Sequence, residues 1–267
     1  MGVNVKTSFL AVISGFSLLV TFDTVWLLAS FISYRPLSTR NDSACQDRFS
    51  ESIATDSVLE PLLLDCLLLL LFILQHSLMA RINIQWILDK IGLGVLTRCV
   101  YVLASCAALQ GMMNYWQPVT SVCLWDAPRD SWIGTIFWSS LVAIHVMSWF
   151  IVYGGCLLVD VGELIGLKQV LYYARGLPDP MKSKSERLIR YYKHMRHPSF
   201  IGFSLLFWGV PQMSLDRAAL AFQLTMYMFI AWSTDEEDIS YLRYQLEDKE
   251  TYANGDWHYS PYSKKLH

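Results

Sequence analysis

The chain has 267 residues, of which 54% are hydrophobic and 16% are charged. Soluble domains are typically about 45–50% apolar and about 25% charged. This composition therefore excludes an ordinary soluble fold, a disordered chain and a small disulfide scaffold. The formal net charge is −2, with 21 basic and 23 acidic residues, so no direct binding of nucleic acid is expected. The composition predicts an integral membrane protein.

Six apolar segments follow one another along the chain. A helix needs about 20 apolar residues to cross a bilayer, and the first four segments meet that length. The last two are short and are joined by three residues, which predicts a helical hairpin; eleven residues rise only about 16 Å as a helix, so the hairpin could instead be re-entrant. The predicted fold is an all-α, polytopic, single-domain membrane protein of about six transmembrane helices, with spans at 9–31, 62–79, 92–113, 132–158, 200–210 and 215–232.

Basic residues in the loops predict the orientation. With six spans, 16 of the 21 Lys and Arg residues lie on the side of the N-terminus, the basic segment 159–199 and the tail 233–267. Arg217 is counted among the five on the opposite side. Because loops rich in Lys and Arg stay on the cytoplasmic side, both termini are expected to face the cytoplasm or nucleoplasm.

Two features of the loops on the opposite, lumenal side agree with this orientation. Asn41 begins an Asn-Asp-Ser glycosylation sequon. Cys45 and Cys123 are the only cysteines in predicted loops, and both of these loops are lumenal. In an oxidising compartment they could form a disulfide, and the alternative is two free thiols.

Several polar residues lie inside the predicted spans. Placing each one in the membrane costs free energy, so each is expected to have a hydrogen-bond partner or a functional role. They are Asp23, Asp65, Gln75, His76 and His145. Hydrogen bonds between helices explain them as well as a proton relay does. They do not form a charged path, so a pump, channel or transporter is not supported, and no metal site is predicted.

The chain changes character after residue 159. Residues 182–196 form a basic amphipathic run suited to an anionic leaflet. The sequence Arg196-His197-Pro198-Ser199-Phe200-Ile201-Gly202 then opens the hairpin, and Ser233-Thr234-Asp235-Glu236-Glu237-Asp238 follows it. Because both ends of a hairpin lie on one side, the two motifs can meet. They would offer an imidazole and several carboxylates to a polar ligand with a positive centre.

These motifs resemble the carboxyl-terminal part of the isoprenylcysteine carboxyl methyltransferases. The resemblance covers about residues 190–252 and rests on the Arg-His-Pro-x-Phe-x-Gly motif, the short hairpin and the Glu-Glu tail. It implies that His197, Pro198, Glu236 and Glu237 would bind the cofactor S-adenosylmethionine if the pocket is functional. The methyltransferases carry an Arg four residues before the tail Glu, where this chain has Ser233. A hydroxyl cannot clamp a carboxylate as a guanidinium does, so catalysis is not expected.

Over its full length the chain resembles the nurim family, which are multi-pass proteins of the inner nuclear membrane. Residues 208–222 and 238–243 carry that likeness. The resemblance implies a nuclear inner membrane protein that is non-catalytic and tightly retained in the nuclear envelope. The expected partners are the lipid bilayer and other nuclear envelope or lamina proteins, with no cofactor.

Two enzymatic alternatives remain open. The first is a membrane methyltransferase of isoprenylcysteine type that uses S-adenosylmethionine. The second is a lipid or sterol reductase that uses NADPH, for which the basic run 182–196 is the only candidate phosphate contact. If no ligand binds, Glu237 is expected to form a structural ion pair with Arg190, Lys193 or Arg196.

Overall fold

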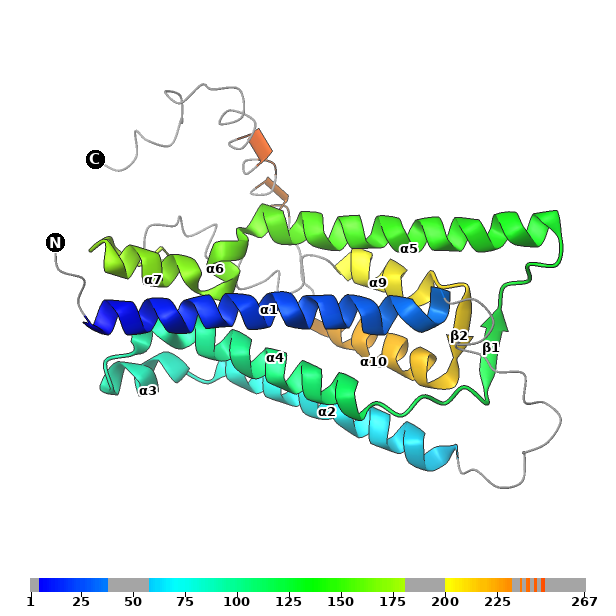
Figure 1. Ribbon diagram of the computed structural model, residues 1–267, viewed down its shortest axis with the longest axis horizontal. Helices are drawn as coiled ribbons and strands as arrows, with labels where there is room; N and C mark the ends of the chain where they lie inside the picture. The colour runs from blue at the N-terminus through cyan, green and yellow to red at the C-terminus, as the bar shows by residue number, and fades with distance from the viewer. Residues whose placement is uncertain are drawn as a thin grey trace.

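Long helices run side by side in the computed structural model of the chain (Figure 1), which describes residues 5–37, 58–180 and 200–231, together with the helical positions 236, 239, 240, 243, 246 and 247. Four helices in these ranges are long and apolar enough to cross a membrane. They are α1 (Val5–Leu37), α2 (Leu59–Arg81), α4 (Thr97–Tyr115) and α5 (Trp132–Val159). The predicted all-α, polytopic membrane fold is therefore confirmed.

Shorter elements complete the two ends of the bundle (Figure 1). The amino-terminal end, where the chain begins, carries α3 (Ile84–Lys90), the 3-10 turn η1 (Gly94–Leu96), α6 (Val161–Ile165) and α7 (Leu167–Ala174). The other end, called the β end below, carries the strands β1 (Cys123–Asp126) and β2 (Gln212–Ser214).

The carboxyl-terminal hairpin consists of α9 (Phe200–Trp208) and α10 (Leu215–Ala231), which pack against each other. The nine residues of α9 rise about 14 Å and the 17 residues of α10 rise about 26 Å. Both lengths fall short of a hydrocarbon core of about 30 Å. The count of six spans therefore stays a prediction.

Local sequence signals explain where several helices begin and end. Ser131 precedes α5 and its Oγ accepts a hydrogen bond from the Gly134 N–H at 3.1 Å, as an N-cap does. Asn83 caps α3 in the same way through the Trp86 N–H. Gly166 ends α6 with φ +94°, a conformation that favours glycine. The turn between α6 and α7 lies directly on α4, because a Cβ on Gly166 would be 2.7 Å from Cys99 Sγ.

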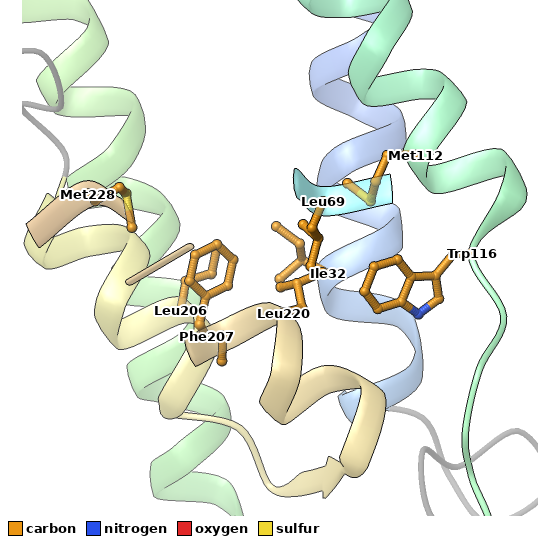
Figure 2. Packing of buried hydrophobic residues seen from close by; sticks show 9 residues of the cluster. Ile32, Leu69, Met112, Trp116, Leu206, Phe207, Leu220 and Met228 are labelled. Carbon is orange, nitrogen blue, oxygen red and sulfur yellow. The ribbon is translucent and has the colours of Figure 1, made fainter. Parts of the chain in front are cut away.

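The helices pack in an order that differs from their order in the chain. Helix α1 packs against α4, α4 against α2, α2 against α10, α10 against α9, and α9 against α5. The hairpin therefore lies between α2 and α5. Figure 2 shows the apolar core, where side chains from α1, α2, α4, α9 and α10 converge. Its labelled members are Ile32, Leu69, Met112, Trp116, Leu206, Phe207, Leu220 and Met228.

The connection between α9 and α10 is an extended strand, which the sequence did not predict. Pro211 has no backbone N–H, and the helix ends before it. The next three residues are buried and form β2, which pairs antiparallel with β1 in a register that sets Ser214 opposite Cys123 and Gln212 opposite Asp126. This pairing provides partners for backbone groups that would otherwise be buried without them.

The structure decides between the two alternatives that the sequence left open for Cys123. Cys123 on β1 is disulfide-bonded. Four cysteines in the described helices are free thiols, namely Cys66, Cys99, Cys106 and Cys156. Cys45 and the sequon at Asn41 lie outside the described residues.

Candidate functional site

The residues predicted to hold a cofactor lie mostly outside the described part of the chain. His197, Pro198, Ser233 and Glu237 belong to the residues that are not described, as does the basic run 182–196. Glu236 is described; it is helical and exposed. That the two motifs meet in space therefore stays a prediction.

Gly202 and Phe200, which belong to the Arg-His-Pro-x-Phe-x-Gly motif and are described, pack α9 against its neighbouring helices. Gly202 lies on α9 against α5, and a Cβ at this position would be 2.9 Å from Val152 Cγ2 and 3.2 Å from the Val152 backbone N. The Phe200 ring lies against Phe229 of α10, with the ring centroids 6.4 Å apart. These residues fix how α9 sits between its two neighbours.

The structure brings three charged side chains together at the β end of the bundle. Asp65 comes from α2, and Asp216 and Arg217 come from the first turn of α10. All three are buried, with exposed fractions of 0%, 1% and 7%. Two consecutive residues after α4 hold the carboxylates side by side, because Trp116 bonds to Asp216 and Gln117 bonds to Asp65. These three residues are called the ion cluster below.

Hydrogen bonds from the segment directly after α4 and from β2 hold the two carboxylates. Trp116, directly after α4, donates its Nε1–H to Asp216 Oδ2 at 2.9 Å, and the Ser214 hydroxyl donates to Asp216 Oδ1 at 2.5 Å. The Gln117 backbone N–H donates to Asp65 Oδ1 at 2.8 Å. Buried charge needs such partners because desolvation is costly. The ion cluster therefore fixes α2, the end of α4 and the start of α10 relative to one another.

Arg217 lies inside the last predicted span and is counted with the basic residues of the lumenal side. It is a buried residue in the first turn of α10. Its Nε is 3.9 Å from Asp216 Oδ2, and its guanidinium carbon lies 4.2 Å from the centroid of the Phe31 ring. The Phe31 ring in turn meets Trp116 edge-on at 5.5 Å. Stacking on an aromatic ring suits a guanidinium in an apolar setting.

A small pocket of about 150 Å³ opens beside the ion cluster. Its walls include the rings of Phe31, Tyr34 and Trp116 together with Arg217. Pockets for drug-sized ligands and cofactors usually hold about 300–1,000 Å³. The pocket is therefore too small for a nucleotide cofactor.

The two histidines of the spans make hydrogen bonds to neighbouring helices, whereas Gln75 bonds to Met79 within α2. Ser33 of α1 is bonded to His145 Nε2 at 2.9 Å and accepts the Trp149 Nε1–H at 3.0 Å, which ties α1 to α5. His76 of α2 is bonded to Tyr101 Oη at 3.0 Å and Ser105 Oγ at 3.2 Å, both on α4. Of the two interpretations that the sequence left open, the structure therefore supports bonds between helices.

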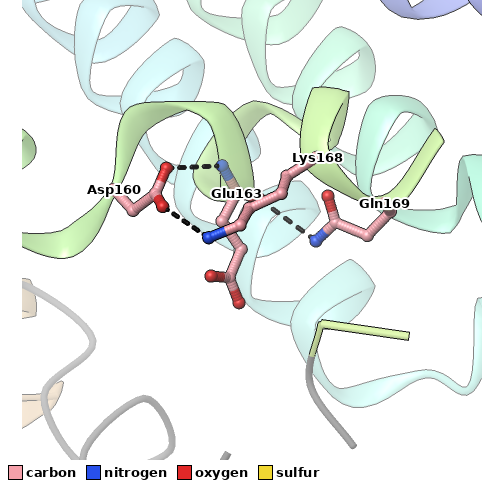
Figure 3. A network of polar contacts seen from close by, with 4 residues as sticks. All are labelled: Asp160, Glu163, Lys168 and Gln169. Atoms are coloured by element: carbon pink, nitrogen blue, oxygen red, sulfur yellow. Dashed lines mark hydrogen bonds and ion pairs between the residues drawn. The ribbon is translucent and has the colours of Figure 1, made fainter. Parts of the chain in front are cut away.

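A polar network closes the amino-terminal end, and it is shown in Figure 3. Asp160 Oδ1 accepts the Glu163 N–H at 3.3 Å, and Asp160 Oδ2 accepts a bond from Lys168 Nζ at 2.8 Å. Burial by itself would lower the pKa of Lys168, but the hydrogen bond to Asp160 and the Asp160 charge raise it above its usual value. Gln169 Nε2 adds a bond to the Glu163 carbonyl. The network joins α6 to α7 and serves a structural role.

The described residues contain no group of three or more His, Cys, Asp or Glu side chains that could hold a metal ion.

The sequence is similar over most of its length to proteins named nurim. It is 39% identical to nurim of Danio rerio over 245 residues, which are 87% of this chain and 88% of that protein. It is 37% identical to human nurim over 240 residues, 87% of this chain and 90% of the relative. A nurim homolog of Drosophila pseudoobscura is 38% identical over 71% of this chain and 74% of its own length. The chain belongs to the nurim family.

Membership of the nurim family and the four long apolar helices together establish a multi-pass membrane protein. No family model matches the sequence, and no solved structure does.

Sequence reasoning overlooked most of the ion cluster in this nurim family member. It singled out Asp65 but not Asp216, Arg217 or their partner Trp116. The available signal was an adjacent acidic and basic residue at the start of an otherwise apolar helix, where charge is unexpected unless it is paired.

Proposed function

We propose that this chain is a resident protein of the inner nuclear membrane, retained by its membrane-spanning helices, and that it does not catalyse a reaction. The observation that supports the location is its membership of the nurim family, at 37–39% identity over 87% of the chain for the relatives from Danio rerio, Bos taurus and Homo sapiens. Both termini face the nucleoplasm or cytoplasm in this proposal, which the uneven distribution of basic residues supports.

The bonding of the buried polar residues supports a non-catalytic role. His145 and His76 are bonded to side chains of other helices, and the carboxylates of the ion cluster accept bonds that hold three elements together. Groups used in this way serve to assemble the bundle. The Ser233 hydroxyl, in place of the Arg expected of a methyltransferase, also speaks against catalysis.

The surfaces of the long helices support retention through the membrane. Large aromatic side chains are exposed on α1 and α5, among them Trp26, Trp132 and Phe150. Such side chains on the outside of a bundle are available to lipid and to the helices of other membrane proteins.

The location can be tested with the full chain carrying an epitope tag at its C-terminus. Digitonin opens the plasma membrane and leaves the nuclear envelope closed, whereas Triton X-100 opens both. The proposal predicts a nuclear rim that antibodies reach only after Triton X-100, together with slow recovery after photobleaching. Staining of the whole endoplasmic reticulum after digitonin alone would contradict both the location and the retention.

The non-catalytic role is tested by ligand binding to the purified full chain. A ligand that binds only the folded state stabilises it by RT ln(1 + [L]/Kd), about 2.7 kcal/mol at 100 times Kd. S-adenosylhomocysteine and NADPH are each added during thermal unfolding, with adenosine as the control. We expect the same midpoint in every sample. A rise with S-adenosylhomocysteine alone would favour a methyltransferase, and a rise with NADPH alone would favour a reductase.

A further inference from the structure

One face of α1 carries a regular exposed stripe that the bundle leaves uncovered. Its residues are spaced alternately four and three apart, the spacing that brings side chains to the seam between two packed helices. Each of them is exposed. We call this stripe the α1 seam; it consists of Val5, Phe9, Val12, Phe16, Leu19, Asp23, Trp26 and Ser30.

Asp23 is the only ionisable residue of the α1 seam. It lies about four residues from the middle of the apolar stretch Val5–Tyr34, or about 6 Å along the helix axis. The carboxylate is exposed on the outside of the bundle at that depth. Lipid tails offer no hydrogen bonds, so an ionisable side chain there is costly and marks a functional site by default.

The bundle provides only a weak partner for this carboxylate. Gln110 of α4 donates its Nε2–H to Asp23 Oδ2 at 3.2 Å and to Thr24 Oγ1 at 2.8 Å. Among the described residues no other side chain bonds to Asp23. The amide holds the carboxylate in place at the surface and brings no positive charge to it.

We propose that the α1 seam docks a transmembrane helix of a partner protein that carries a Lys or Arg at the depth of Asp23. Charge complementarity selects this occupant, because a cation neutralises the carboxylate and hydrogen-bonds to its free oxygen. A second copy of this chain packed in parallel would place two Asp23 carboxylates opposite each other. A single polar residue in such a seam also fixes the register of the two helices. The docking surface does not depend on the nuclear location.

The experiment uses the full chain in phosphatidylcholine vesicles and three synthetic transmembrane peptides. The peptides are leucine-rich and differ in one central residue, which is Lys, Leu or Glu. Energy transfer between a fluorescent tag at the N-terminus of the chain and a dye on the peptide reports association. We expect the Lys peptide to bind about tenfold more tightly than the Leu peptide, and the Glu peptide to bind no better than the Leu peptide.

Variants of Asp23 test whether the carboxylate causes this preference. Asp23→Leu should abolish the preference for Lys, Asp23→Glu should keep it, and Asp23→Lys should reverse it in favour of the Glu peptide. Leu157 is exposed on α5. Because Ser33 lies level with His145 and the two helices run in opposite directions, Leu157 lies within about 3 Å of the depth of Asp23. The variant Asp23→Leu with Leu157→Asp therefore moves a carboxylate to another helix at similar depth. We expect no recovery of binding in that control. Elution volume and unfolding midpoint verify that each variant is folded.

Three outcomes would overturn the proposal. Equal binding of the Lys and Leu peptides to the unmodified chain would show that Asp23 recruits no cation, and this comparison needs no variant. Full recovery in the Leu157→Asp control would show that any exposed carboxylate at this depth suffices. Self-association of the chain that is lost in Asp23→Leu would assign the α1 seam to a second copy.

Discussion

The contact between α5 and α9 leaves no room for a side chain at Gly202, which makes Gly202→Ala a sharp test of the packing. A Cβ at this position would lie 2.9 Å from Val152 Cγ2 and 3.0 Å from Ile151 Cγ2. Both neighbours are β-branched and stiff at χ1, and the Val152 backbone N at 3.2 Å cannot swing away. The two helices must therefore move apart or strain.

Overpacking of this kind costs about 1–3 kcal/mol. Replacing Gly by Ala inside a helix contributes about 1 kcal/mol in the opposite direction. Gly202→Ala should therefore lower the free energy of unfolding by about 0–2 kcal/mol. Gly154 on α5 is the matched control, because a Cβ there would have no neighbour within 4 Å. Gly154→Ala should raise stability by up to about 1 kcal/mol.

The difference between the two variants isolates the packing cost, because the helix-propensity contribution is common to both. Unfolding in mixed micelles by titration with sodium dodecyl sulfate, followed by tryptophan fluorescence, measures both free energies. We expect Gly202→Ala to be less stable than Gly154→Ala by about 1–3 kcal/mol. If the two variants are equally stable, the close approach of α9 to α5 is wrong.

Three further substitutions test the core, the link between α1 and α5, and the ion cluster in the same unfolding assay. Leu206→Ala removes a fully buried side chain and should cost about 2–5 kcal/mol; a loss below about 1 kcal/mol would show that the core is not packed as in Figure 2. Ser33→Ala should lower the free energy of unfolding by about 0.6–2 kcal/mol. The control Ser140→Ala removes an exposed hydroxyl that bonds within its own helix, and it should leave stability unchanged. Equal effects of the two variants would contradict the link between α1 and α5. Asp216→Ala leaves the buried Arg217 without this carboxylate and should cost about 3–5 kcal/mol; unchanged stability would exclude a structural role for the ion cluster.

The long helices were predictable from the sequence because the length of an apolar run is a local property. Each of the first four runs is long enough to cross a bilayer, and each overlaps a helix of the structure. The helix ends were less predictable; α1 extends from Val5 to Leu37, beyond the apolar run at both ends. The strand β2 could not be foreseen, because its partner β1 lies far away in the sequence and only the folded bundle brings the two together.

The polar contacts were only half predictable. Asp65 and His145 stand out in the sequence because they interrupt apolar helices, but their partners do not. Ser33 and the Gln117 N–H are ordinary groups that become partners through the rotation and packing of the helices. A sequence shows which buried groups need a bond, and the fold decides which groups supply it.

The pairing of β1 with β2 sets an order of assembly during synthesis. A ribosome makes β1 before α5, and it makes β2 only after α9 has been completed. The α1, α2, α4 and α5 helices must therefore enter the membrane while β1 still lacks its neighbouring strand. The β end is then the last part of the bundle to close, and a chain released before residue 212 would leave β1 as an open edge for quality control to recognise.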